Sequence, residues 1–240
     1  MDTMSPTALE LLWGSPQRPR RGPKPSLSLD RIVAAAIELA DAEGLANLSM
    51  ARLAEQLGCA KMALYRYVPG KAELTALMID EAYGPPPELT AAQQDSTEQP
   101  WRARLRRWTV ELHDRMRGHP WVLEIAIGIR PFGPREVAWT EAALAALADT
   151  ALNGSERLDA VVLLTGHARS LAQQSAGVPD ENIEAELGKQ LLQTLAGRAA
   201  DYPHVLAAFT ESGPPESQNN ALHFGIDRIL DGLAALTDRR

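Results

Sequence analysis

The sequence predicts an all-α protein with two domains. Apolar residues recur every three or four positions along most of the chain, as Ile32, Ala36, Leu39 and Ala40 show, and this is the period of one face of a helix. Glycine and proline interrupt the pattern where helices are expected to end, for example at Gly44. We find no convincing strand pattern and no repeat of fixed length.

Composition narrows the class of protein. The chain has 240 residues, 45% of them hydrophobic, and a single cysteine, so it can bury a core but cannot form an internal disulfide. No Cys/His cluster has the spacing of a zinc site. No apolar run reaches the ~18 residues of a membrane span or has the form of a signal peptide. We therefore expect a cytoplasmic protein with no metal and no other cofactor.

Breaks in the pattern divide the chain into four parts. Residues 1–26, rich in Pro and Arg, are predicted to be a disordered basic arm. Residues 27–84 are predicted to form a small domain, with helices over 29–43, 49–57, 60–67 and 71–83. Residues 85–100 are the expected linker. Residues 101–240 are predicted to form the larger domain, with helices over 101–117, 134–152, 155–176, 183–199 and 219–237.

Charge is distributed unevenly between these parts. The whole chain has a net charge of −7, but residues 16–75 hold nine Lys/Arg and six Asp/Glu, a net of +3. The remaining residues therefore carry −10. A basic N-terminal part on an acidic remainder is expected to turn its basic side toward a polyanion such as DNA.

Residues 49–67 have the pattern of a helix-turn-helix. Two short predicted helices meet at Gly58, and Leu53 and Leu64 would pack them together. This packing leaves basic, tyrosine and small apolar side chains outside, which suit phosphates, guanine and thymine methyl groups. Ser49 and Lys71 stand at neighbouring helix starts, where backbone amides favour phosphate. The candidate DNA contacts are therefore Ser49, Lys61, Met62, Ala63, Tyr65, Arg66, Tyr67 and Lys71. The alternative interpretation is the solvated face of an ordinary helical bundle.

The segment LSLDRIVAAAIELADAEGLANLSMARLAEQLGCAKMALYRYVPGKAELTALMIDEAYG, residues 27–84, resembles the DNA-binding domain of TetR-type transcriptional repressors. The resemblance implies a recognition helix over residues 60–66, and operator contacts at the positions of Ser49, Lys61, Met62, Ala63, Tyr65, Tyr67 and Lys71. It also implies phosphate contacts by Arg52 and Arg66. Tyr65 and Lys71 match the usual phosphate anchors, whereas Lys61, Met62 and Ala63 occupy positions that vary with operator sequence. Residues 101–240, through RGHPWVLEIAI and a helix that begins with Gly-Pro, resemble the tetracycline-repressor-like branch.

This resemblance implies a homodimeric repressor that binds a palindromic operator and is released by a small-molecule effector. No histidine constellation matches the magnesium-drug site of the tetracycline repressor, so neither magnesium nor tetracycline is expected. The basic arm could follow the minor groove beside each half-site, or it could be a solubilising tail. Cys59 could sense redox state, although a small buried apolar residue is the simpler interpretation.

Two helices of the larger domain are candidates for a dimer contact. Residues 155–176 are apolar on most faces, and residues 219–237 carry Leu222, Ile226, Ile229, Leu233 and Leu236 at helical spacing. Two such helices from each of two chains could form a four-helix bundle. The alternative is that both helices only fill the core of one chain.

Aromatic residues are concentrated in residues 101–139 of the larger domain. Aromatic side chains with a few polar groups often line ligand cavities, although single tryptophans more often fill a core. The candidate ligand contacts are Trp108, His113, Met116, Trp121, Phe132, Trp139 and His167.

Other functions fit the sequence less well. No nucleophile–base pair, metal set or phosphate loop is present, so we expect no catalytic residues and no enzyme activity. A DNA-binding regulator that is controlled by a protein partner, or that activates transcription, remains an alternative. A dry, fully packed core around Trp108 and Trp139 would favour control by a protein partner.

Overall fold

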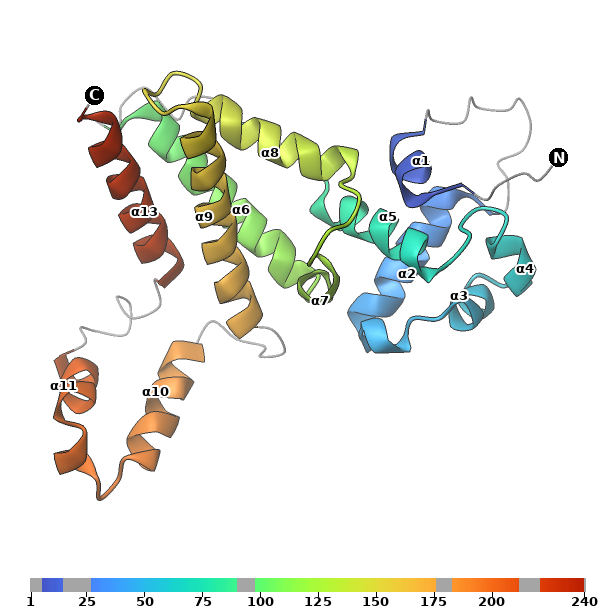
Figure 1. The fold of residues 1–240 in the computed structure, drawn as a ribbon. Coiled ribbons are helices and arrows are strands. Elements are labelled where there is room, and N and C mark those ends of the chain that lie inside the picture. Colours follow the sequence, from blue (N-terminus) through green and yellow to red (C-terminus); the bar gives the residue numbers. More distant parts are fainter. Residues whose placement is uncertain (1–5, 15–26, 90–97, 176–182, 212–220, 240) are drawn as a thin grey trace.

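The computed structural model describes residues 6–14, 27–89, 98–175, 183–211 and 221–239, and every regular element in these ranges is a helix (Figure 1). The predicted all-α class is therefore confirmed. A small domain, here called the head, contains α2 (Leu29–Glu43), α3 (Met50–Gln56), α4 (Lys61–Leu64) and α5 (Lys71–Tyr83). A larger domain, the body, contains α6 (Pro100–Gly118), α7 (Val122–Ile125), α8 (Pro134–Ala146), α9 (Gly154–Gln174) and α13 (Ala221–Thr237).

Serine side chains cap the starts of two head helices, α2 and α3. The Ser28 hydroxyl accepts a hydrogen bond from the Arg31 amide at 3.2 Å, and the Ser49 hydroxyl accepts one from the Arg52 amide at 3.3 Å. These caps satisfy amides that the first turn of a helix leaves without a partner. The predicted ranges 29–43 and 71–83 match α2 and α5.

The predicted helix over residues 60–67 is longer than the structure allows. Helix α4 ends at Leu64, and the amides of Tyr67 and Val68 both return to the Leu64 carbonyl at 2.9 Å. A residue that precedes proline disfavours the helical conformation, and Val68 precedes Pro69. The chain therefore leaves the helix early and turns toward α5.

The N-terminal segment also differs from the prediction. Residues 8–13 form α1 (Ala8–Trp13), which begins with a capping box between Thr7 and Glu10 and packs against α5. The indole Nε1 of Trp13 donates to the Phe132 carbonyl of the body at 2.9 Å. Disorder was therefore the wrong prediction for residues 8–13, because the Pro/Arg composition of the whole segment outweighed the short apolar stretch ALELLW. The predicted disorder of residues 15–26 lies outside the described residues.

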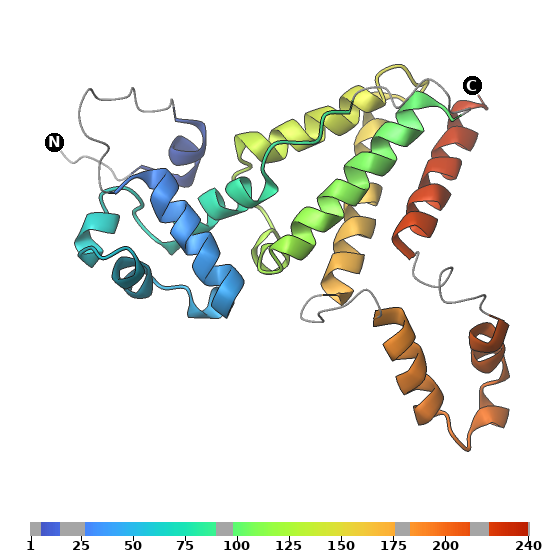
Figure 2. The ribbon, with the colours of Figure 1, turned by 180° about the vertical axis from the view of Figure 1, so that it is seen from behind.

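The body is a bundle in which α6 contacts α8, α9 and α13 (Figure 2). Leu105, Leu112, Leu164, Ile226 and Leu230 are buried in its core. Asn153 caps α9 through a capping box with Glu156. Helix α6 begins at Pro100, the last residue of the predicted linker. Residues 90–97 of that linker lie outside the described ranges.

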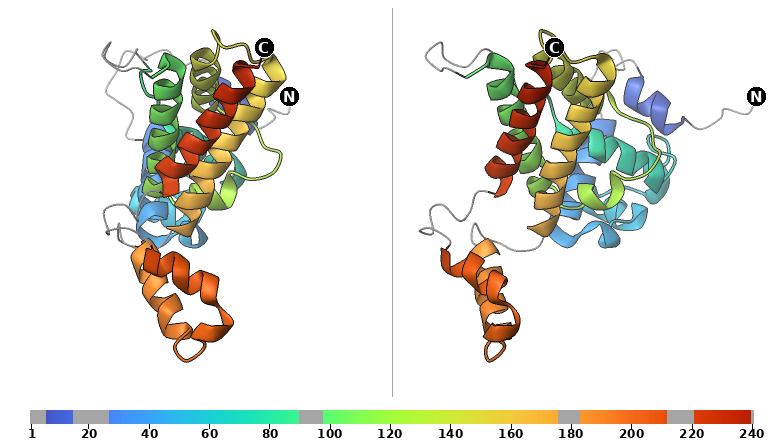
Figure 3. Two further views of the ribbon diagram at one scale, coloured as in Figure 1. Left: turned by 90° about the vertical axis from the view of Figure 1, so that its left-hand side faces the viewer. Right: turned by 60° about the vertical axis from the view of Figure 1, so that its left-hand side comes forward.

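Helices α10 (Ile183–Thr194) and α11 (Pro203–Glu211) form a pair that extends beyond the ends of α9 and α13 (Figures 1 and 3). Phe209 lies directly over Gly188, where a Cβ atom would be 3.1 Å from the ring. The predicted helix over 183–199 ends sooner, at Thr194, and α11 has no counterpart in the sequence analysis. In the described parts of the chain, no helix has both the length and the apolar composition to cross a membrane.

The docking of α1 gives a first testable prediction. Leu12 is 8% exposed, whereas Leu9 on the same helix is 55% exposed. Replacing Leu12 by Ala removes about 2 kcal/mol of burial, so α1 should open more often. We expect the α1 amides of Leu12→Ala to exchange hydrogen about 10-fold faster or more. Leu9→Ala is the matched control and should leave these rates nearly unchanged; equal effects would show that α1 is not held through Leu12.

Candidate nucleic-acid interface

Helices α3 and α4 form a hook around the turn at residues 57–60. Gly58 has a φ of 63°, a left-handed conformation that favours glycine. The Cys59 amide closes the turn on the Ala54 carbonyl at 3.0 Å, and the Cys59 side chain packs against the head core as a free thiol. Leu53 and Leu64 are fully buried in that core. The sequence predicted this packing, which fixes the hook and leaves one face of α4 open.

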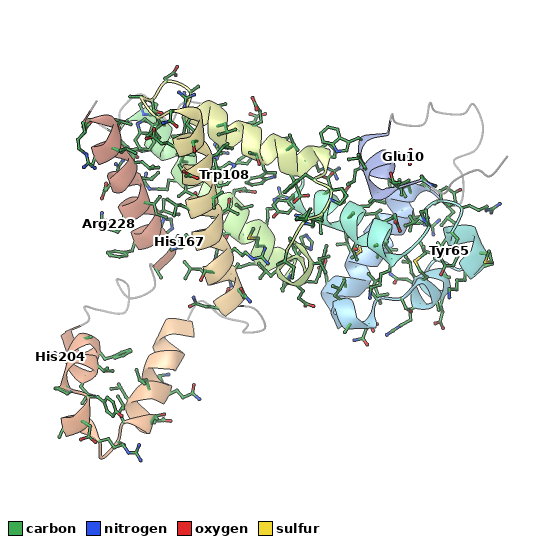
Figure 4. All side chains as sticks on the ribbon, viewed as in Figure 1. Glu10, Tyr65, Trp108, His167, His204 and Arg228 are labelled. Carbon is green, nitrogen blue, oxygen red and sulfur yellow. The ribbon has the colours of Figure 1, made fainter. Side chains whose placement is uncertain are left out.

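The open face of α4 lies at the end of the head that is remote from the body, where Figure 4 labels Tyr65. Lys61 and Arg66 are exposed, and Met62 is 72% exposed. Tyr65 and Ala63 are half-buried. The Lys61 ammonium lies 5.8 Å from the centre of the Tyr65 ring, a contact that orients both side chains. The structure therefore brings the central candidate DNA contacts onto one surface.

Four candidate contacts beside α4 already have partners inside the head. Ser49 caps α3, and Arg52 pairs with Glu43 through contacts of 2.8 and 2.5 Å. The Tyr67 hydroxyl donates to the Leu27 carbonyl at 3.0 Å, and the Lys71 ammonium lies 3.4 Å from the Leu45 carbonyl. A phosphate contact in which Tyr67 donates must therefore break the bond to Leu27, whereas the Arg52 guanidinium has further N–H donors beyond those that face Glu43.

The seven candidate ligand contacts do not share one site. Trp108 and Trp139 pack edge to face with ring centres 5.8 Å apart, and Trp108 Nε1 donates to the Trp139 carbonyl at 2.9 Å. Met116 is buried in the same core, and His113 is buried on the same helix as Met116. Phe132, in contrast, is 60% exposed beneath the Arg130 guanidinium.

Two further candidates lie in other places. Trp121 belongs to the core of the head. His167 lies between α9 and α13, with Nε2 3.0 Å from the Leu222 carbonyl. Its ring is so close to Gly225 that a Cβ atom there would be 2.2 Å from Cε1. Figure 4 shows Trp108 and His167 on different helices of the body.

A hollow of about 440 Å³ opens at the end of the body, where α6 begins and α8 and α13 end. None of the seven candidates lines it. The Nε atom of Arg104 is buried and has no hydrogen-bond partner. The lining residues are Gln99, Pro100, Trp101, Arg104, Ala146, Asp149, Thr150, Ala151 and Thr237.

One junction between head and body is a carboxylate at the start of α8. Asp80 of α5 accepts a hydrogen bond from the Arg135 amide at 2.9 Å and a longer one from the Glu136 amide at 3.4 Å. Gly133 makes room, because a Cβ atom there would lie 2.0 Å from Asp80 Oδ1. Burial raises the pKa of Asp80 more than these two amides lower it. Arg130 forms a forked pair with the buried Glu136 beside this contact.

A second junction lies at α7. Trp121 Nε1 donates to Asp41 of α2 at 2.6 Å, and His119 Nδ1 lies 2.9 Å from the same carboxylate. On the other side of α7, the Arg169 guanidinium of α9 donates to the Leu123 and Ala126 carbonyls at 2.5 and 2.8 Å. Sequence analysis missed Asp41, Asp80 and Arg169, because isolated charges in helices carry no motif.

The two-domain helical fold and the exposed hook define a helix-turn-helix transcriptional regulator. Residues 32–78 match the family model described as bacterial regulatory proteins, tetR family. Residues 94–237 match the tetracyclin repressor-like C-terminal domain. The chain belongs to the TetR family.

Relatives support this assignment over nearly the whole chain. The HTH-type transcriptional repressor DrrR1 of Streptomyces coeruleorubidus is 38% identical, over 97% of this chain and 86% of the relative. An HTH-type transcriptional regulator of Saccharopolyspora erythraea is 30% identical, over 93% and 91%. The crystal structure of ActR of Streptomyces coelicolor in complex with actinorhodin superposes with a TM-score of 0.69 at 26% identity, over 88% of this chain and 98% of that chain.

The α8 junction generates a prediction about stability. Asp80→Ala leaves the Arg135 amide without its acceptor and should lower the free energy of unfolding by about 1–2 kcal/mol. Asp80→Asn keeps an oxygen acceptor and should lose less. Urea unfolding of both variants at neutral pH measures the difference, and equal losses would contradict the capping role.

The pH dependence of stability in wild type and Asp80→Asn tests the raised pKa of Asp80. Because burial raises the pKa of Asp80, the folded state binds its proton at a higher pH than the unfolded state does. The stability that protonation of Asp80 contributes is complete below the unfolded pKa and is lost as pH rises through the folded pKa. Wild type should therefore gain stability relative to Asp80→Asn as pH falls through the folded pKa; a constant difference would contradict the raised pKa.

Proposed function

We propose that this TetR-family regulator is a repressor that binds a palindromic operator as a homodimer in the cytoplasm and leaves it when a small molecule binds the body. The observation that carries the proposal is the open face of α4. Lys61, Met62 and Arg66 project from a hook that buried leucines hold in place. Residues 16–75, which include the hook, carry a net charge of +3, whereas the remaining residues carry −10. This distribution favours an orientation in which the hook faces DNA.

The operator contacts divide by chemistry. Lys61, Met62, Ala63 and Arg66 suit base edges and the adjoining phosphates of the major groove. Tyr65 and Lys71 suit phosphate oxygens, and Lys71 stands at the first turn of α5, where backbone amides also attract anions. The Ser49 oxygen accepts the hydrogen bond that caps α3, and its O–H can donate to a phosphate oxygen at that helix start. Tyr67 can donate to DNA only by exchanging its Leu27 contact, whereas Arg52 can offer its remaining N–H donors to a phosphate while it stays paired with Glu43.

The dimer is proposed to form through α9 and α13. These neighbouring helices expose apolar side chains, including Val162 at 69% and Phe224 at 65%. Leu158 and Leu163 extend the exposed face of α9. Covering such a face with the same face of a second chain makes a four-helix bundle. The twofold then presents two α4 helices to half-sites about 34–36 Å apart.

A small-molecule effector is supported by the likeness to ActR, which has been crystallised with actinorhodin. Among the candidate contacts, Trp108, Met116 and Trp139 share one core, and His113 lies on the same helix as two of them. An effector that enters there must separate the packed Trp108 and Trp139 rings.

The packed Trp108–Trp139 contact also favours a second candidate, a regulator controlled by a protein partner. Both rings are only 2% exposed, and the indole N–H of each is bonded to a backbone carbonyl. Such a core needs no ligand to satisfy it. A thermal-shift screen distinguishes the two candidates, because only the effector model expects compounds that both raise the melting temperature and release DNA.

Operator binding is tested with duplex DNA from the region upstream of the gene. Lys71→Ala should weaken binding and reduce the slope of log affinity against log salt by about 1, because one phosphate contact is lost. Tyr65→Phe removes only a hydroxyl and should weaken binding without changing that slope. Fluorescence anisotropy at several KCl concentrations measures both quantities. Arg107→Ala, an exposed base on the body, is the control; no salt-sensitive binding by wild type would refute the repressor.

The dimer is tested by placing a charge on the exposed face of α9. Val162→Glu should yield monomers in sedimentation analysis, because carboxylates facing each other across the twofold would be desolvated and would repel. Val137→Glu is a matched control, since Val137 is also exposed but lies on α8. A dimer that survives Val162→Glu as well as it survives Val137→Glu would place the interface elsewhere.

A further inference from the structure

Arg169 is placed to connect α9 with α7. Its guanidinium donates to the carbonyls of Leu123 and Ala126, at 2.5 and 2.8 Å. Helix α7 has only four residues, so most of its carbonyls have no amide partner within the helix. A cation at the C-terminal end of a helix also interacts favourably with the negative end of the helix dipole. Arg169 therefore supplies donors from outside the helix to two carbonyls at this end of α7.

The opposite side of α7 belongs physically to the head. Trp121 and Val122 are 2% and 3% exposed and are part of the head core. The Trp121 indole and His119 ring both bond to Asp41 of α2, and α7 also contacts α5. Any displacement of α7 must therefore move the head or break these bonds. Figure 1 shows α7 between the head and the body helices.

We propose that Arg169 is a positioning residue that transmits the orientation of α9 to the head through α7. The inference rests on the proposed function, because α9 is the proposed dimer helix and the head carries the proposed operator contacts. The path is short. It runs from α9 through the Arg169 guanidinium to the α7 carbonyls, and from α7 to α2 through Trp121 and Asp41 and to α5 by direct packing. A change of the dimer helices becomes a change in the position of α4.

The chemistry of this link requires arginine. Two carbonyls that stand three residues apart are bonded by two different nitrogens of one planar guanidinium. A lysine ammonium is a single compact point and cannot match this fork. A methionine fills a similar volume but donates to neither carbonyl. Arg169→Lys should thus fall between wild type and Arg169→Met.

Arg157 provides a matched control on the same helix. Its guanidinium also donates to backbone carbonyls, those of Leu152, Ala148 and Thr150 at 2.9, 3.0 and 3.2 Å. All three lie within the body. Arg157→Met therefore removes the same kind of bond from α9 without touching α7.

The test compares full-length wild type, Arg169→Met, Arg169→Lys and Arg157→Met. In hydrogen exchange without DNA, Arg169→Met should speed exchange in residues 121–126 and in α5 about 10-fold, whereas Arg157→Met should not. Binding to duplex DNA from the upstream region should weaken at least 5-fold more in Arg169→Met than in Arg157→Met. Unchanged exchange in α5, or equal effects of the two methionine variants, would overturn the inference.

Failure of the proposed function has a different signature. If wild type itself binds no duplex, operator binding fails, while the exchange comparison still decides whether Arg169 controls the head. If wild type binds and the two methionine variants weaken binding equally, the operator proposal stands and Arg169 is only a structural bond.

Discussion

The burial of Trp121 in the head is the contact on which the arrangement of the two domains depends. Trp121 follows α6 in sequence, but its ring lies in the core that α2 and α5 build. Its indole N–H would be costly to bury without an acceptor, and Asp41 supplies one at 2.6 Å. A residue that follows the first helix of the body therefore lies inside the head, and the domains share a core residue instead of meeting only at their surfaces.

Carboxylates of the head recur at this boundary with different partners. Asp41 accepts a hydrogen bond from the Trp121 indole and contacts the His119 imidazole. Asp80 instead accepts hydrogen bonds from backbone amides at the start of α8. Each places a charge at a partly buried position, which is costly unless donors surround it. These bonds are directional, so they define an angle between head and body that apolar packing alone would leave loose. The contact of Trp13 with Phe132 adds a third connection on the outside.

Local patterns predicted the parts of the fold that depend on local chemistry. The serine cap of α2 and the terminal glycines of α2 and α5 stand next to the ends they define, so the predicted bounds agree with the structure. Helix α1 was missed because the Pro/Arg composition of residues 1–26 outweighed its local signals, the capping box and the apolar stretch, and because its docking on α5 cannot be read from neighbouring residues. The aromatic set was grouped by sequence distance, but the break after α6 sends Trp121 to the head and Trp108 to the body core. The candidate DNA contacts form a surface because one turn of helix and one glycine suffice to place them.

The close approach of His167 to Gly225 has a consequence for the spacing of α9 and α13. A ring that fills the space where a Cβ atom would stand sets the shortest separation of the two axes at that point. Any larger residue at position 225 would push α9 and α13 apart at this point and would change their angle along the whole length of both helices. The size of residue 225 thus fixes the spacing of α9 and α13, so one substitution there would alter the geometry of this helix pair along its length.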